Sequence, residues 1–244
     1  MKIAILTPSR GRPQGFLQLV QSTFETCSGY HQIEHYCYLD WDDASVAEYN
    51  ALLSNCPQYT EQVILHVNEP QSISKSWNVI ADAALKNGAN IIIMGNDDIV
   101  YRTQNWDVRL VEEFSKFNDN IVCMWFEDGI NSERHCAFPI VSAEWIRTVG
   151  YLTPGIMNFG YNDTWIFDIA KLVNRTHFIG DVLTEHMHFS LHKSQFDETY
   201  QRHRTMEAGN MYQKDAVIFN NTLFLRRIAA DKLANAICAE KTNG

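Results

Sequence analysis

The amino-acid sequence predicts an α/β fold in which a mostly parallel, Rossmann-like sheet is flanked by helices and followed by a helical C-terminal tail. Three observations support this prediction. In the first hundred residues, short apolar runs alternate with stretches that have the apolar spacing of a helix. Each apolar run stops at polar or acidic residues, as buried parallel strands commonly do. From about residue 197 onward the pattern is helical.

The first hundred residues contain the regular part of this pattern. Ligands of open parallel sheets bind beyond the carboxyl ends of the strands, so the polar loops after these runs are the first place to search for a site. The predicted strands are residues 2–7, 35–39, 62–67 and 90–94, and the predicted helices are residues 16–26 and 74–86.

The second half is less regular, and no repeat, low-complexity tract or linker divides it from the first. We therefore expect one domain over residues 1–244, with apolar tail residues that cover the core or pair subunits. The expected strands are residues 121–126, 178–182 and 184–189, with an apolar stretch at 136–141, and the expected helices are residues 143–149 and 163–173.

Composition excludes some classes of protein. The 244 residues are 45% hydrophobic and carry a formal net charge of −9, which disfavours an extended polyanion-binding surface. No run approaches the roughly 18–20 apolar residues of a membrane span, and Pro8 and Arg10 interrupt the N-terminal apolar run, so we expect a cytoplasmic protein. The six cysteines are scattered, which is typical of free thiols.

Asn96-Asp97-Asp98 directly follows a predicted buried strand. Adjacent carboxylates need solvent, donors or a cation, and a divalent ion with oxygen ligands is one such partner. The alternative is an ordinary acidic turn. His186 and His188 lie two residues apart in a predicted strand, which would place both on one face as metal ligands, although a single histidine is more often a packed or surface residue.

Asp163 opens a predicted helix after a glycine-rich loop. Two interpretations stand: a helix N-cap, or a carboxylate that accepts a proton from an acceptor hydroxyl. Glu127 and Asp128 are rival bases, or residues of a turn after a strand.

Basic and aromatic residues near the predicted loops have two interpretations as well. Each basic side chain could neutralise a diphosphate or be a solvated surface charge; these are Arg10, Arg12, Lys75 and Lys193. Asp40, at a strand end, could bind a ribose or base or form a turn. We expect Trp41 and Trp77 to be core residues.

Together these residues resemble the GT-A glycosyltransferases, especially the family-2-like group, over roughly residues 1–200. The segment Thr7–Pro13, with Pro8 and Arg10, resembles the loop that cups the donor nucleotide. Asp40 resembles the acid that meets the base, and Lys75 lies where the family has a basic residue at a helix start.

The later segments follow in the family's order. Asn96-Asp97-Asp98 resembles the D-x-D motif with Asn in first place, which implies Asp98 as a metal ligand and Asn96 or Asp97 as a ribose or metal partner. Gly160–Thr164 resembles the G-x-E-D segment with Asn for Glu, which implies Asp163 as the base. Glu185–His188 resembles the late histidine motif, with His186 and His188 completing the metal shell; Lys193, Asp197 and Tyr200 resemble the segment that closes over the donor.

The resemblance implies a glycosyltransferase dependent on Mn²⁺ or Mg²⁺, which moves a hexosyl or pentosyl group from a UDP- or GDP-sugar to an acceptor hydroxyl, with inversion and Asp163 as base. The acceptor could be a glycan, lipid, protein or modified DNA base. Residues 1–100 would bind the nucleotide, residues 101–200 would receive the acceptor and complete the metal site, and residues 201–244 would form the tail. The alternatives are a nucleotidyltransferase of related fold and a non-catalytic module that binds sugar nucleotides or carbohydrate.

Overall fold

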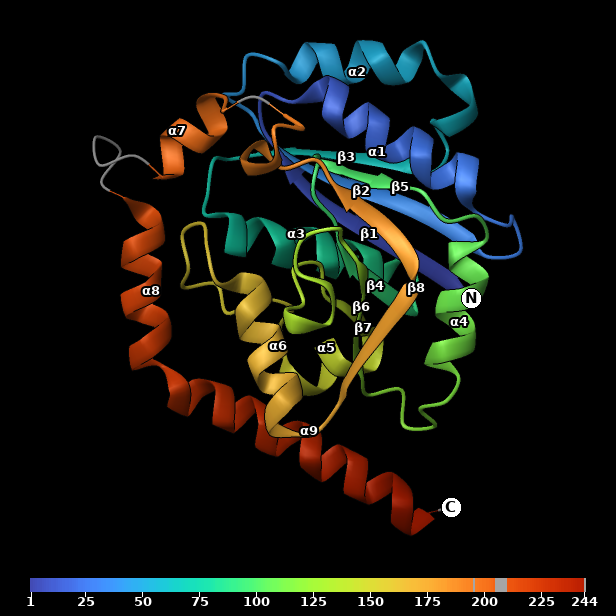
Figure 1. Cartoon of the computed structure of the whole chain (residues 1–244), viewed down its shortest axis with the longest axis vertical. Helices are drawn as coiled ribbons and strands as arrows, with labels where there is room; N and C mark the ends of the chain where they lie inside the picture. The colour runs from blue at the N-terminus through green and yellow to red at the C-terminus, as the bar shows by residue number, and fades with distance from the viewer. Residues whose placement is uncertain (195, 205–209, 244) are drawn as a thin grey trace.

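The computed structural model describes residues 1–194, 196–204 and 210–243. In this part of the chain an eight-stranded sheet has helices on both faces, and its strand order is β3-β2-β1-β4-β7-β6-β8-β5 (Figure 1). The strands are β1 (Lys2–Ser9), β2 (Gln32–Asp40), β3 (Val63–Asn68), β4 (Ile91–Met94), β5 (Ile99–Tyr101), β6 (Cys123–Glu127), β7 (Ile140–Ser142) and β8 (Thr176–His186). The helices are α1 (Pro13–Thr26), α2 (Val46–Ser54), α3 (Ile73–Lys86), α4 (Trp106–Phe114), α5 (Ala143–Val149), α6 (Asn162–Leu172), α7 (Glu198–Arg204), α8 (Met211–Asn221) and α9 (Leu223–Asn243), with short 3₁₀ turns at Pro57–Tyr59, Ser132–Arg134 and Phe189–Leu191.

The sheet has a parallel half and a mixed half. Strands β3, β2, β1 and β4 are parallel to one another, so their carboxyl ends meet along one edge. Beyond β4, strand β7 is antiparallel to both β4 and β6, whereas β6 and β8 are parallel and β5 is antiparallel to β8. The regular first half and the less regular second half of the sequence pattern correspond to these two parts.

Both faces of the sheet are covered, because the central strands are apolar on both sides. In β1, Ile3 and Ile5 pack in the core beside α1, α2 and α4, whereas Ala4 and Leu6 pack in the core beside α3, α5, α6 and α9. All four side chains are completely buried. Such two-sided burial explains why the runs are almost continuously apolar and do not alternate with polar residues.

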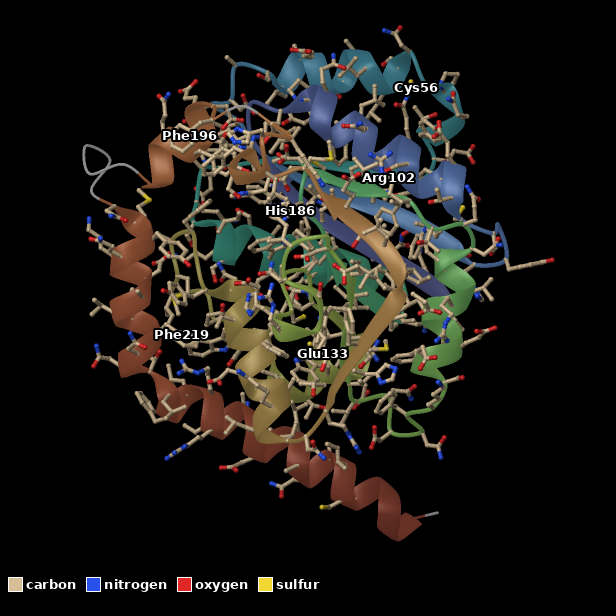
Figure 2. The ribbon with its side chains drawn as sticks, viewed as in Figure 1. Cys56, Arg102, Glu133, His186, Phe196 and Phe219 are labelled. Atoms are coloured by element: carbon tan, nitrogen blue, oxygen red, sulfur yellow. The ribbon has the colours of Figure 1, made fainter. Side chains whose placement is uncertain are left out.

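The C-terminal helix α9 packs on the outside of α5 and α6, and α8 lies beside the loop that precedes α6 (Figure 1). Arg226, only 3% exposed, donates to Asp168 on α6 at 2.6 Å and lies 3.8 Å from the centre of the Phe219 ring, which Figure 2 labels. Leu233 and Ile237 are buried in the core. The tail therefore covers the core, as one of the two sequence interpretations proposed. None of the helices among the described residues has the length and apolarity needed to cross a membrane.

Several local predictions were wrong. The predicted strands 178–182 and 184–189 are one strand, β8, because its exposed Gly180-Asp181 step lies in a bulge where the register jumps from Ile179 to Leu183. Helices α2 and α4 and the three-residue strand β5 were not predicted. Trp77 is buried as expected, but Trp41 is 64% exposed because it lies in the turn after β2, beyond the end of the sheet.

Helix α4 is tied to β8 by a cluster of charged side chains around Glu113. Its carboxylate pairs with Arg109, with Lys116 at 2.5 Å and with His177 at 2.7 Å, and the Glu113 side chain is 4% exposed. Burial by itself would raise the pKa of Glu113, but hydrogen bonds from Lys116, Arg109 and His177 lower it to about 2. The carboxylate is therefore ionised in the folded protein over the physiological pH range.

Candidate active site

A cavity of about 380 Å³ opens at the carboxyl ends of β1, β2 and β4. Its walls come from the loops after these strands, the start of α3, the loop before α6, the end of β8, and the first residues of α7 and α8. Pro8, Arg10, Asp40 and Asn96 line it, together with the Asp97-Asp98 pair. The position agrees with the rule that open α/β sheets bind ligands beyond their strand ends.

Two glycines allow the loop after β4, residues 95–98, to reach this cavity; this segment is called the acidic loop below. A Cβ atom on Gly95, just after β4, would lie 2.8 Å from the Thr7 hydroxyl and 2.9 Å from Ile5 Cγ2 on β1. A Cβ atom on Gly15 of α1 would overlap the backbone carbonyl oxygen of Asp97. The loop is therefore held closely between β1 and α1, and this contact sets the position of Asp97 and Asp98.

Asp97 is anchored by protein donors. Its Oδ2 accepts a hydrogen bond from Ser9 Oγ at 2.6 Å, and its Oδ1 accepts one from Arg12 Nη1 at 3.0 Å. Burial raises the pKa of Asp97, and the positive charge of Arg12 opposes that rise. Both carboxylate oxygens are thus engaged by the protein, which leaves Asp98 as the freer acid of the pair.

Asp98 and His186 meet at the base of the cavity, although they are far apart in the sequence. Asp98 Oδ2 lies 3.4 Å from His186 Nε2, at the end of β8 (Figure 2), and accepts a hydrogen bond from Tyr200 at 3.0 Å. Burial alone would raise the pKa of Asp98, but the hydrogen bond and charge of His186 lower it to about 2. The Met187 amide also donates to the Asp98 carbonyl at 2.7 Å, which joins β8 to the acidic loop.

The arrangement fits an open site for a divalent cation. Asp98 Oδ1 and His186 Nδ1 are buried and have no hydrogen-bond partner among the described residues. Buried polar atoms without partners are rare and require an explanation such as an ion or water. The described part of the chain contains no cluster of three or more His, Cys, Asp or Glu side chains placed to hold a metal. A cation here would therefore complete its shell with water and substrate oxygens, as Mg²⁺ and related ions do.

His188 lies beside this pair but in a different arrangement from the predicted one. Strand β8 ends at His186, so strand alternation does not extend to His188, which begins the turn Phe189–Leu191. Its Nδ1 accepts a hydrogen bond from the Ser190 amide at 3.2 Å, and its ring lies 5.0 Å from that of His186. Both histidines line the cavity, but one lone pair of His188 is used within its own turn.

Arg12 is the basic residue closest to the acidic pair. It donates to Asp97 and also forms two hydrogen bonds to Asp197, at 2.6 and 2.9 Å, across 185 positions of sequence. The guanidinium lies 4.5 Å from the centre of the Tyr200 ring, and the Thr199 hydroxyl donates to the Arg10 carbonyl at 3.1 Å. The start of α7 is therefore fastened over the loop that follows β1.

The other predicted basic residues are distributed differently. Arg10 lines the cavity and pairs with Asp40 at 2.9 Å and with Asp42. Lys75 is exposed on α3 and is not among the residues that line the cavity. Lys193 lies outside the cavity lining too, and its ammonium donates to Glu185 at 2.6 Å. The structure brings Arg10 and Arg12 to the cavity and leaves these two lysines outside its wall.

Asp163 lies in the first turn of α6, outside the residues that line the cavity. The N-cap of this helix is Tyr161, not Asp163, and the Tyr161 side chain makes no capping hydrogen bond. Asp163 Oδ2 lies 2.9 Å from His135 Nε2, and the Thr164 hydroxyl is 3.3 Å from Oδ1. The side chain is thus engaged by another side chain across the fold, and the N-cap interpretation does not describe it.

The rival bases have structural roles in a turn. Asp128 is 3% exposed and accepts hydrogen bonds from the backbone amides of Ile130, Asn131 and Ser132 at 2.8, 2.6 and 3.3 Å. Burial opposes ionisation, but these donors lower the pKa of Asp128. Glu127 accepts a hydrogen bond from the Gly129 amide at 2.7 Å. The turn interpretation accounts for both acids.

One residue important for the cavity was missed in the sequence. Asp215 on α8 is completely buried and accepts hydrogen bonds from the backbone amides of Asn158, Phe159 and Gly160 at 2.9, 2.6 and 2.9 Å. Asn158 and Phe159 line the cavity, so the tail helix holds part of its wall. A lone Asp in a helical pattern gives no sign of burial, because the usual expectation for such a residue is a solvated surface.

Comparison with known proteins supports the predicted fold. No protein-family model and no curated protein matches the sequence. Among solved structures, the chain is similar to the mannosyltransferase PcManGT from Pyrobaculum calidifontis in complex with GDP-Man and Mn²⁺ (TM-score 0.57, 11% identity, 99% of this chain and 75% of that chain). It is also similar to GalNAc-T7 with UDP, GalNAc and Mn²⁺ (0.64, 12%, 76% and 44%) and to S. aureus TarS 1–349 (0.54, 14%, 75% and 59%).

At these identities the similarity is one of fold. The neighbours are glycosyltransferases, and the predicted GT-A fold, with a mostly parallel sheet flanked by helices and followed by C-terminal helices, is confirmed. The chain spans 59% of the length of TarS 1–349.

Proposed function

We propose that this chain, which has the GT-A glycosyltransferase fold, transfers a sugar from a nucleoside-diphosphate sugar to an acceptor hydroxyl and requires a divalent cation. One observation carries the proposal: beside a cavity at the carboxyl ends of the parallel strands, Asp98 and His186 each have a buried ligand atom without a partner in the described part of the chain. An ordinary acidic turn would satisfy its carboxylates with backbone amides, as Asp128 does. Asp98 does not share that pattern.

Different parts of the cavity wall would bind different parts of the donor. Near the ends of β1 and β2, Pro8, Arg10 and Asp40 would bind the nucleoside, with the Asp40 carboxylate accepting hydrogen bonds from ribose or base. Asp98, His186 and Arg12 would face the diphosphate. A divalent cation bound by Asp98 and His186 would supply the positive charge that stabilises the departing nucleoside diphosphate. Asp97 holds Arg12 in place through its hydrogen bond.

Asp163 is the proposed base. It would take the proton of the acceptor hydroxyl as the acceptor oxygen attacks the anomeric carbon from the face opposite the diphosphate, which gives inversion. Asp163 does not line the cavity, so the acceptor would have to present its hydroxyl between the cavity and the start of α6. Its carboxylate is not occupied by helix capping, whereas Asp128 and Glu127 are occupied by a turn.

The structural neighbours guide the choice of donor and metal. PcManGT is recorded with GDP-Man and Mn²⁺, GalNAc-T7 with UDP, GalNAc and Mn²⁺, and TarS with UDP-GlcNAc. We therefore propose a UDP- or GDP-sugar as donor and Mn²⁺ as the first metal to test. Water can replace the acceptor in such an assay, so the acceptor need not be known.

The experiment is donor hydrolysis with UDP-GlcNAc, UDP-glucose and GDP-mannose, in Mn²⁺ and in excess EDTA. We expect Mn²⁺-dependent release of nucleoside diphosphate from at least one donor, loss of release in Asp98→Ala, and retention in Asp82→Ala, which removes an exposed carboxylate of α3. Pyrophosphate release from a nucleoside triphosphate would indicate the nucleotidyltransferase instead. Nucleotide binding without turnover of any donor would indicate the binding module.

A further inference from the structure

The proposed base, Asp163, is paired with His135, a residue to which the proposed reaction assigns no role. His135 lies in the loop between the 3₁₀ turn Ser132–Arg134 and β7, near Glu133 in Figure 2, and Asp163 lies 28 positions later on α6. The His135 Nε2 and Asp163 Oδ2 atoms are 2.9 Å apart, and the two side chains are 31% and 29% exposed. The pair is thus partly buried and partly exposed to solvent.

The His135 ring is held from a second direction. It packs edge-to-face on Phe167, one turn further along α6, with ring centres 5.7 Å apart and an angle of 80° between the rings. Edge-to-face contacts are a favoured arrangement of aromatic rings. The imidazole is therefore oriented by α6 itself when its Nε2 meets Asp163.

The loop that carries His135 also reaches the metal-binding candidates. Phe138 packs on the ring of His186 at 4.9 Å, and the Pro139 carbonyl accepts a hydrogen bond from the amide of Met94, the last residue of β4. One short loop therefore contacts the proposed base at one end and the cation site at the other. This connection places the His135–Asp163 pair on the same side of the molecule as the cavity.

We propose that His135 is a positioning residue for the base: its Nε2–H holds Asp163 Oδ2. Asp163 Oδ1, which has the Thr164 hydroxyl at 3.3 Å, is then presented to the acceptor hydroxyl. This inference rests on the proposed function. In the step itself, the acceptor O–H proton passes to Asp163 as the acceptor oxygen forms its bond to the anomeric carbon. The bond from that carbon to the diphosphate oxygen breaks, and its electron pair leaves with the nucleoside diphosphate. His135 remains the hydrogen-bond donor throughout.

The charges around His135 make this pairing dependent on pH. The hydrogen bond to Asp163 raises the pKa of His135, burial and the nearby Lys171 oppose that rise, and Asp128 adds to it. A doubly protonated imidazole still holds Asp163, but its positive charge makes the carboxylate a weaker base. Turnover should therefore fall as pH decreases through the His135 pKa. This decrease on the acidic side of the pH profile, the acidic limb, should be absent when His135 is replaced.

The test is a double-mutant cycle with the donor that the parent protein hydrolyses in Mn²⁺. We expect His135→Ala to lower kcat about tenfold or more, with donor KM and UDP affinity within about twofold of the parent. In an Asp163→Asn background the same replacement should have no further effect, because His135 acts through Asp163. The matched histidine control is His31→Ala, because His31 directly precedes β2 at the end of the strand away from the cavity. This replacement should leave kcat unchanged.

His135→Gln retains an amide donor and keeps the test valid if the alanine variant folds poorly. It should recover part of kcat and lose the acidic limb of the pH profile. Unchanged kcat in both His135 variants, with turnover in Asp163→Asn still about a hundredfold below the parent value, would overturn this inference alone. Losses that multiply in the double variant would overturn it as well. If the parent protein hydrolyses no donor, the proposed function itself fails, so the two failures are distinct.

Discussion

Replacing Asp215 with alanine would remove the acceptor that holds the cavity loop to α8. The carboxylate is completely buried and accepts hydrogen bonds from three consecutive backbone amides and from the Asn158 side chain at 3.1 Å. A hydrogen bond to a charged group contributes about 1.5–3 kcal/mol, and a buried donor left unpaired costs about 1–3 kcal/mol. Since these terms overlap and the loop can relax, we expect Asp215→Ala to lower the free energy of unfolding by about 3–5 kcal/mol.

Thermal unfolding followed by circular dichroism measures this effect. For a chain of this size, each kcal/mol shifts Tm by about 2–4 °C, so the melting temperature should fall by about 6–20 °C. Asp215→Asn retains one acceptor oxygen and should show a smaller loss. Asp231→Ala removes an exposed carboxylate of α9 and should change the free energy of unfolding by less than about 0.5 kcal/mol.

Nucleotide binding gives an independent measurement on the same variants. Because Asn158 and Phe159 line the cavity, Asp215→Asn should weaken UDP or GDP binding in Mn²⁺ even at temperatures where it remains folded. An Asp215→Ala protein that melts within 2 °C of the parent would show that the hydrogen bonds to the loop contribute little. Our account of the tail as part of the cavity wall would then be wrong.

The remaining predictions concern the site and the stability of the chain. His186→Ala should weaken Mn²⁺ binding, measured by calorimetry, more than His188→Ala does, because one lone pair of His188 is used in its own turn; equal losses would refute this ranking. Asp163→Asn should lower sugar transfer about a hundredfold or more while Tm and UDP affinity stay near the parent values, and near-normal transfer would remove it as the base. The free energy of unfolding should decrease as pH falls from about 5 towards 2, because Glu113 keeps a pKa of about 2 in the folded protein and binds a proton more readily when unfolded. Glu113→Gln should flatten that part of a urea-denaturation pH series, and an unchanged slope would contradict the assignment. Gly95→Ala should cost about 1–3 kcal/mol by urea denaturation because its Cβ atom meets β1, and a neutral effect would show that the acidic loop is not tightly held.

Local patterns in the sequence were enough to predict most of the parallel half of the sheet. A buried strand between two layers of helices must be apolar on both sides, and this requirement is visible as a run such as Ile91–Met94. The loops after such strands are where this fold class binds ligands, so Asp40 and Asp98 could be selected as candidates from position and residue type alone. The GT-A fold, which the resemblance of the motifs implied, is confirmed by the structural neighbours.

Elements with weak local signals were missed. Strand β5 is only three residues long, too short for alternation to be recognised, and it is stabilised by pairing with β8 from much later in the chain. The apolar positions of α4 are interrupted by two buried acids, Asp107 and Glu113. Each has a partner far away in the sequence: the Ser28 hydroxyl donates to Asp107, and His177 pairs with Glu113. Such partners cannot be identified from a local window, so the buried acids resembled solvent-exposed positions.

The residue types of the candidate site were evident in the sequence, whereas only the tertiary structure decided their partners. Nothing local distinguishes Asp97, whose two oxygens accept from Ser9 and Arg12, from Asp98, which has one oxygen without a partner among residues 1–194, 196–204 and 210–243. In the same way, the assignment of Asp163 to a helix cap or to a side-chain pair depended on where the loop carrying His135 returns to the fold. The physical reason is that strand and helix periodicity arises from neighbours a few residues apart, whereas hydrogen bonds and pKa shifts in a site depend on chain segments brought together only by folding.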